Sequence, residues 1–175
     1  MAARVMTARF RHHAVYLAVW ALLALASPAA PAAPEIAEEN AVKAAFIYNF
    51  AKFSEWPDDP WSRAPRLRIC VTGNGSDLTE AVTALESKPP VRGKAVDVRL
   101  LARADEGGQC HILVITGRAS ALPVLQSLGS APVLTVGESD GFASTGGVIG
   151  LYMDGDKVRF EANPDAAQRA GLKLS

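Results

Sequence analysis

Few residue types in this sequence could carry out thiol or acid–base chemistry. Cys70 and Cys110 are its two cysteines, and His111 follows the second of them. In an oxidising compartment an even number of cysteines favours a disulfide, the alternative being two separate buried thiols, and two lone cysteines are not a zinc pattern. His111 begins an apolar stretch, which favours a hydrogen-bonded core histidine over a general base. Because no serine or cysteine has a recognisable catalytic partner, we expect no enzymatic activity.

A second candidate for chemistry is the turn Gly73-Asn74-Gly75-Ser76. A glycine-rich turn between a strand and a helix can bind a phosphate, because backbone amides at the start of the helix face the anion. The third glycine of the dinucleotide-binding fingerprint is missing here. An ordinary strand-to-helix turn therefore explains these glycines better, and we expect no nucleotide cofactor.

The chain is organised around a predicted amphipathic helix over residues 42–57, VKAAFIYNFAKFSEWP. Its large apolar residues, spaced so that they share one side of a helix, are Val42, Phe46, Phe50 and Phe53. Lys43 falls on the opposite, polar side. Pro57 lacks the amide donor that a helix needs, so we expect the helix to end there.

After this helix the chain alternates between strand and helix patterns. Strands are predicted at residues 66–72, 95–101, 110–116, 132–137, 148–153 and 157–162, and helices at 76–88, 119–128 and 164–174. This order predicts an α/β fold: a single domain with a largely parallel sheet flanked by helices. Asp154-Gly155-Asp156 predicts a tight turn that makes the last two strands a C-terminal antiparallel hairpin. That turn offers too few oxygens for calcium, so we expect no metal site.

A disulfide places a condition on this sheet. Cys70 falls near the end of the first predicted strand and Cys110 at the start of the third. If these strands are parallel neighbours, they must be staggered, or the bridge must run through a loop at a strand end. The sequence leaves both arrangements open.

The first residues have the features of a secretory signal peptide. A basic start is followed by a stretch from Ala14 to Ala26 without charge, too short to span a membrane, and then by small residues and prolines. Cleavage is expected after Ala26 or Ala32, which makes residues 1–32 the signal and residues 33–175 the domain. Removal of residues 1–32 leaves 15 basic and 18 acidic residues, a net charge of −3. This charge gives no indication of nucleic-acid binding.

Five blocks of the sequence resemble the YfiR-like proteins of Gram-negative bacteria. They are VKAAFIYNFAKFSEWP, LRICVTG, CHILVI, LTVGESDGFASTGGVIGL and KVRFEANPDAAQRAGLKLS, in the family's order. The resemblance implies a non-enzymatic periplasmic regulator that forms a homodimer. Its expected partner is the periplasmic domain of an inner-membrane diguanylate cyclase, whose cyclic di-GMP synthesis it represses. A second expected partner is an outer-membrane lipoprotein that sequesters the regulator.

The resemblance also bears on individual residues. The family's first cysteine pair matches Cys70 and Cys110, which implies a disulfide. Some relatives have a second pair where this chain has Ala143, Ser144 and Leu151, so redox control through that pair is not expected. Relatives continue past the AGLKLS motif, so the last helix is expected to be truncated.

Contact residues are predicted from the preference of binding hot spots for aromatic side chains. The candidates are Trp56, Trp61 and Tyr152, whereas the family pattern favours core packing for Phe46, Phe50 and Phe53. The alternative function is a periplasmic small-molecule-binding protein. Its pocket would lie at the strand ends, near Gly73 to Ser76 and the loop over residues 138–147.

Overall fold

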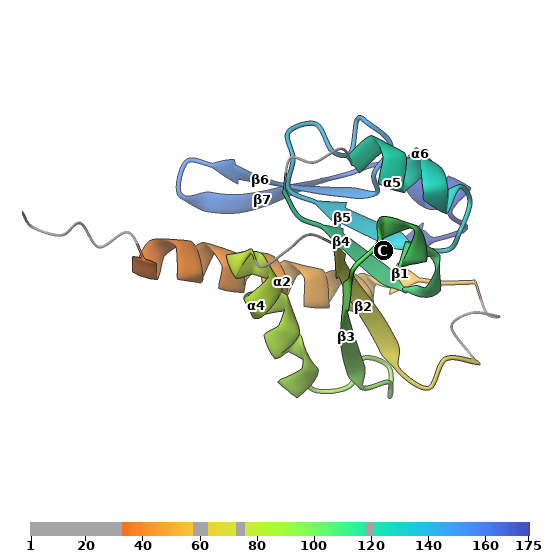
Figure 1. Cartoon of the computed structure of the whole chain (residues 1–175), viewed down its shortest axis with the longest axis horizontal. Helices are drawn as coiled ribbons and strands as arrows, with labels where there is room; N and C mark the ends of the chain where they lie inside the picture. The colour runs from red at the N-terminus through yellow and green to blue at the C-terminus, as the bar shows by residue number, and fades with distance from the viewer. Residues whose placement is uncertain (1–32, 58–62, 73–75, 118–120) are drawn as a thin grey trace, which may run out of the picture. The chain divides into compact units, whose positions relative to one another are not determined.

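A computed structural model describes residues 33–57, 63–72, 76–117 and 121–175. Their main sheet has the strand order β3-β2-β4-β5-β6-β7, in which β7 alone is antiparallel to its neighbour (Figure 1). The strands are β2 (Leu67–Thr72), β3 (Val96–Leu101), β4 (Ile112–Ile115), β5 (Leu134–Gly137), β6 (Ile149–Asp154) and β7 (Lys157–Ala162). The predicted α/β class, the largely parallel sheet and the closing hairpin are therefore confirmed.

Helices cover both faces of this sheet, as a sheet with near-continuous apolar strands requires. One face packs against α2 (Ala33–Phe53), α4 (Asp77–Thr83) and the 3₁₀ helix η1 (Ala84–Ser87). The other face packs against α5 (Ala121–Leu128), near the 3₁₀ helix η2 (Ala104–Gln109). The last helix, α6 (Pro164–Arg169), follows β7.

Alternate residues of each strand supply the two apolar cores. On the α2 side, Ile69 of β2 and Val114 of β4 are fully or almost fully buried. On the α5 side, the core contains Cys70, Leu113 and Phe142. This alternation follows from the two-residue period of a strand, and it explains why β2 and β4 carry apolar residues at nearly every position.

Helix α2 differs from its prediction at both ends. It begins at Ala33, nine residues before Val42, and ends at Phe53 rather than at Pro57. The chain leaves the helix early because β1 (Ser54–Glu55) pairs with β8 (Lys173–Leu174) in a small antiparallel sheet. As a consequence Phe53 is 56% exposed, so the prediction that it packs in the core is wrong, whereas Phe50 is buried.

The C-terminal segment also differs from its prediction. Asn163 caps α6, its Oδ1 accepting a hydrogen bond from the backbone N–H of Ala166, as expected for a residue that precedes Pro164. The helix ends at Arg169, however, because Gly171 adopts a φ of +69° that favours glycine and breaks the helical path. The predicted helix over 164–174 is therefore wrong in its second half, and the last residues form β8 instead.

Candidate functional site

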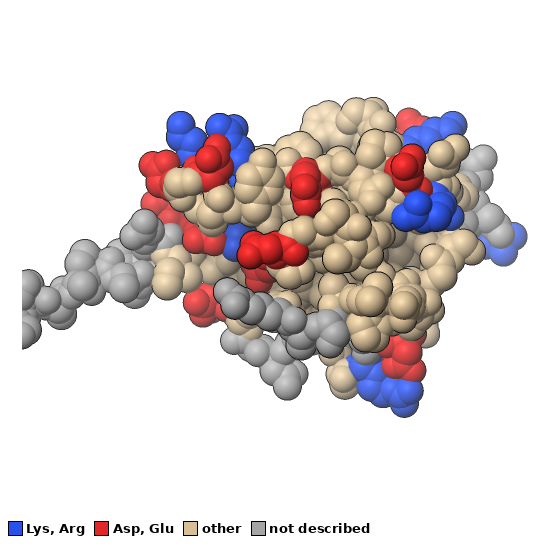
Figure 2. Space-filling view, turned by 90° about the horizontal axis from the view of Figure 1, so that it is seen from above, with Lys and Arg blue, Asp and Glu red and all other residues tan. Residues whose placement is uncertain are grey.

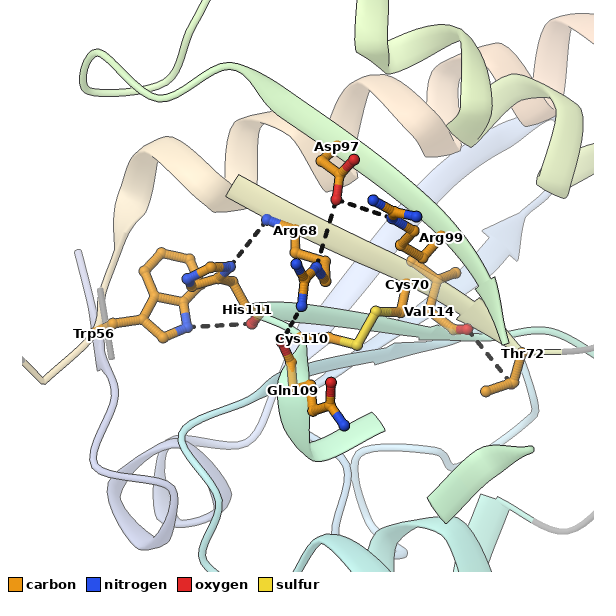
Figure 3. The surroundings of a disulfide bond; sticks show 10 residues. All are labelled: Trp56, Arg68, Cys70, Thr72, Asp97, Arg99, Gln109, Cys110, His111 and Val114. Atoms are coloured by element: carbon orange, nitrogen blue, oxygen red, sulfur yellow. Dashed lines mark hydrogen bonds and ion pairs between the residues drawn. A yellow bond between two sulfur atoms is a disulfide. The ribbon is translucent and has the colours of Figure 1, made fainter. Parts of the chain in front are cut away.

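The two cysteines form a disulfide on the α5 side of the sheet (Figure 3). Their Cα atoms are 5.9 Å apart, and both residues are buried. Strands β2 and β4 are parallel neighbours, and Cys110 precedes the start of β4 at Ile112. The bridge therefore runs from the middle of β2 to the connection before β4, which is the second of the two arrangements that the sequence left open.

His111, next to the disulfide, is held through both its ring and its backbone. Its Nδ1 accepts a hydrogen bond from the backbone N–H of Arg68 at 2.9 Å, and its carbonyl accepts one from Nε1 of Trp56 at 3.1 Å (Figure 3). The rings of Trp56 and His111 meet edge to face, with centroids 6.1 Å apart. Because Nδ1 is occupied as an acceptor inside the fold, the prediction of a hydrogen-bonded core histidine is confirmed.

Arginines of β2, β3 and the segment before β2 surround a hollow that Cys110 of the disulfide also lines. Nε atoms of Arg68 and Arg99 lie 3.4 and 3.1 Å from Oδ2 of Asp97. Burial raises the pKa of Asp97, but the hydrogen bonds and charges of Arg99 and Arg68 outweigh it and lower that pKa below its usual value. Arg63 and Arg66 line the same hollow, which has a volume of about 460 Å³. The excess of guanidinium groups makes this hollow attractive to anions.

A second hollow lies at the carboxyl ends of β4 and β5, where open α/β sheets commonly bind ligands. Its central group is Lys43 of α2, whose Nζ lies 2.6 Å from Oε1 of Glu39 and 3.0 Å from Oε2 of Glu138. The hollow, of about 460 Å³, is lined by Lys43, Gly117, Glu138, Ser139 and Asp140. Acidic groups therefore outnumber the single ammonium.

Lys43 is buried, so its predicted place on the polar side of the helix is wrong. Burial lowers the pKa of its ammonium, but the hydrogen bonds and charges of Glu39 and Glu138 outweigh this and raise that pKa above its usual value. The Glu39 and Lys43 spacing of one helical turn could have indicated the first pair from sequence. Nothing in the sequence indicated Glu138, which is distant along the chain.

The third feature is a groove between α2 and the β6–β7 hairpin, here called the hairpin groove. Its volume is about 680 Å³, its apolar walls are Val42, Phe46, Met153 and Val158, and its rim carries charged residues of both elements. Figure 2 shows one face of the molecule, on which acidic and basic side chains lie next to one another in several groups around a largely uncharged middle. An apolar groove with a mixed charged rim has the composition of a protein-contact surface.

The aromatic candidate residues occupy different environments. Tyr152 of β6 is 45% exposed, opposite Arg159 of β7, and belongs to the hairpin that forms the groove. Trp56 is buried against His111, so it contributes to the core, and its role in binding stays a prediction. Trp61 lies outside the described residues.

The predicted glycine turn is described only at its last residue. Gly73, Asn74 and Gly75 lie outside the described residues. The side chain of Ser76 accepts a hydrogen bond from the backbone N–H of Thr79 at 3.3 Å, which confirms it as the cap of α4. Its hydroxyl oxygen thus already has a structural partner.

The residues that the structure describes contain no helix that is both long and apolar enough to cross a membrane. Nor do these residues contain a group of three or more His, Cys, Asp or Glu side chains placed to hold a metal ion.

Comparison with known protein families matches residues 40–175, from within α2 to the last residue, to one family model. The chain belongs to the YfiR/HmsC-like family.

Proposed function

We propose that this protein is a periplasmic regulator that binds the periplasmic domain of an inner-membrane diguanylate cyclase and represses its synthesis of cyclic di-GMP. The observation that carries this proposal is the family match, which extends over residues 40–175 and so includes every described strand. Signal-peptide features at the N-terminus support export. The regulator is itself bound by an outer-membrane lipoprotein and acts as a homodimer.

Repression in this scheme is a difference between two binding energies. The regulator lowers cyclase activity only if it binds the inactive state of the cyclase more tightly than the active state. A shift from mostly active to mostly inactive cyclase needs a differential affinity of about 10⁴-fold, if the change is from 99:1 to 1:99. Repression of this kind requires no covalent chemistry.

We assign the β6–β7 hairpin to the cyclase, with its groove on one face and Tyr152 on the other. Val42 and Met153 line the groove, each at 40% exposure, and Tyr152, the strand neighbour of Met153, is 45% exposed on the opposite face of the hairpin. Exposed aromatic and methionine side chains are enriched in the centres of protein interfaces. Tyr152→Ala removes a large exposed side chain and leaves the buried core intact, so it should weaken cyclase binding and leave the melting temperature unchanged.

Deletion of the gene tests the proposed role in cells. The proposal predicts higher cyclic di-GMP and more biofilm in the deletion strain, and a return to the parental level when the gene is restored. Deleting the partner cyclase as well should abolish the increase, because the regulator then has nothing to repress. Unchanged cyclic di-GMP in the single deletion would contradict the proposal.

A second candidate function is binding of a small molecule, favoured by the hollow around Lys43 at the strand ends. Its lining of Glu138, Asp140 and a paired Lys43 would accept a cationic or hydrogen-bonding ligand better than an anion. Ligand binding to the folded state raises the melting temperature by mass action. A metabolite screen that produces no shift in melting temperature would count against this function.

A further inference from the structure

On the outer edge of β7, the backbone N–H and C=O groups that point away from β6 have no strand partner in the part of the chain that the structure describes. The backbone N–H of Asn163 points to β6, where it donates to the carbonyl of Val148 at 2.8 Å. The backbone groups of successive residues in a strand point in opposite directions. Residues 162, 160 and 158 therefore point away from β6, whereas residues 161, 159 and 157 point toward it. The β7 residues whose N–H and C=O groups point away from β6 are Val158, Phe160 and Ala162. β7 is the last strand of the sheet, and all of its residues are exposed or half-buried.

On the opposite edge of the sheet a side chain occupies one outward backbone donor. There the backbone N–H of Val98 in β3 donates to Oε1 of Glu86 at 2.9 Å, which hinders pairing with another strand at this position. Within the described part of the chain, no side chain makes a comparable bond to the outer edge of β7. The β7 edge is therefore the less obstructed of the two among the described residues.

The charges of β7 select one way to pair it with itself. Two copies of β7 related by a two-fold axis at Phe160 place Arg159 of each copy opposite Glu161 of the other. These are non-hydrogen-bonded pairs, in which the Cα atoms approach to about 4.5 Å. An axis at residue 159 or 161 instead places Arg159 or Glu161 opposite its own copy, and an axis at 158 places Lys157 opposite Arg159. The axis at Phe160 thus brings unlike charges together without a like pair.

Apolar side chains on the other face of β7 support the same arrangement. Phe160 is 46% exposed, although its ring packs against two rings of α2. The centroid of the Phe160 ring lies 5.6 Å from that of Phe46 and 5.1 Å from that of Phe50. With the axis at Phe160, the two Phe160 residues form a hydrogen-bonded pair and their rings lie on the same face of the joined sheet. Each ring would then cover the exposed part of the other.

We propose that β7 is the dimerisation edge of this protein and pairs with β7 of a second copy about a two-fold axis at Phe160. The two sheets then continue as one, and the hairpin grooves of the two copies lie on either side of the axis. This inference specifies the interface of the homodimer proposed above. It does not depend on which protein the dimer binds.

Charge exchange at this edge gives a sharp test, using exported protein purified from the periplasm. Arg159→Glu and Glu161→Arg each convert two attractive cross-strand pairs into two repulsive ones, so each variant alone should dimerise about tenfold more weakly or worse. A mixture of the two variants restores both pairs and should contain heterodimers. Analytical ultracentrifugation of each variant and of the mixture measures the dissociation constants. Lys157→Glu is the matched control, because Lys157 faces the uncharged Asn163 across the axis.

Val158→Pro provides an independent variant, because it removes an outward N–H and leaves the bonds to β6 in place. It should also yield monomers, and unchanged circular dichroism would show that the fold is intact. Dimers that persist in Arg159→Glu, or no heterodimer in the mixture, would overturn the interface. A wild-type protein that stays monomeric at tens of micromolar would overturn the homodimer and its interface together. Neither outcome would touch the proposed cyclase partner, which is tested separately by the deletion strain.

Discussion

Removing the disulfide is the perturbation whose size the structure allows us to work out most directly. Cys70 and Cys110 are separated by 40 positions in the sequence. In the chain-entropy model, opening a loop of that length costs about 4 kcal/mol of unfolding free energy, through greater freedom of the unfolded chain. A domain of this size has a total stability of roughly 5–15 kcal/mol, so the loss is a large part of it. The double substitution Cys70→Ala and Cys110→Ala should therefore lower the melting temperature by roughly 10 °C or more.

Urea unfolding followed by tryptophan fluorescence measures this loss. Either single substitution, Cys70→Ala or Cys110→Ala, opens the same loop and should cost a similar amount. Reduced wild-type protein serves as the matched control, since it loses the bridge and keeps both side chains. A loss below about 1 kcal/mol in the variants, with an intact bridge in the wild type, would refute the reasoning that the bridge stabilises the fold by restricting the unfolded chain.

Three further predictions concern single side chains. Trp56→Ala should destabilise the protein by about 3–5 kcal/mol because the ring is buried against His111; an unchanged urea midpoint would show that the ring is not part of the core. Lys43→Met leaves Glu39 and Glu138 without their ammonium partner and should lower the unfolding free energy by about 1–3 kcal/mol. Substitution of an exposed lysine, Lys157→Met, is the control and should lower it little. Equal urea midpoints for the two variants would show that the ion pairs of Lys43 do not stabilise the fold. The lowered pKa of Asp97 contributes stability that is present above the usual carboxyl pKa of 3.8 and is lost as the pH falls below it. The wild type should therefore lose its stability advantage over Asp97→Asn in acid. A stability difference between the two proteins that stays constant down to pH 2 would contradict this.

The sequence predicted the architecture well because its signals are local. Strand periodicity, the caps Ser76 and Asn163, and the turn at Gly155 each act within a few residues, and the corresponding elements are present. The errors arose where a distant segment decides the local structure. Phe53 becomes exposed because Ser54–Glu55 pair with Lys173–Leu174 at the other end of the chain.

The candidate site was less predictable for the same reason. The buried place of Lys43 depends on Glu138, which is 95 residues away, and no local pattern connects the two. The hairpin groove likewise requires α2 to lie beside β6 and β7, which follows from the topology of the folded chain. By contrast, the disulfide needed only two cysteines and a family resemblance.

Repression of the cyclase through its periplasmic domain can be tested on isolated membranes. Cyclase activity is measured in inside-out membrane vesicles in which the purified regulator is enclosed on the periplasmic side, with GTP supplied outside. We expect cyclic di-GMP synthesis to fall in a saturable way as the enclosed concentration of regulator increases, and Tyr152→Ala to shift this curve to higher concentration. A rate of synthesis that does not depend on the regulator at any concentration would show that the protein does not repress the cyclase directly.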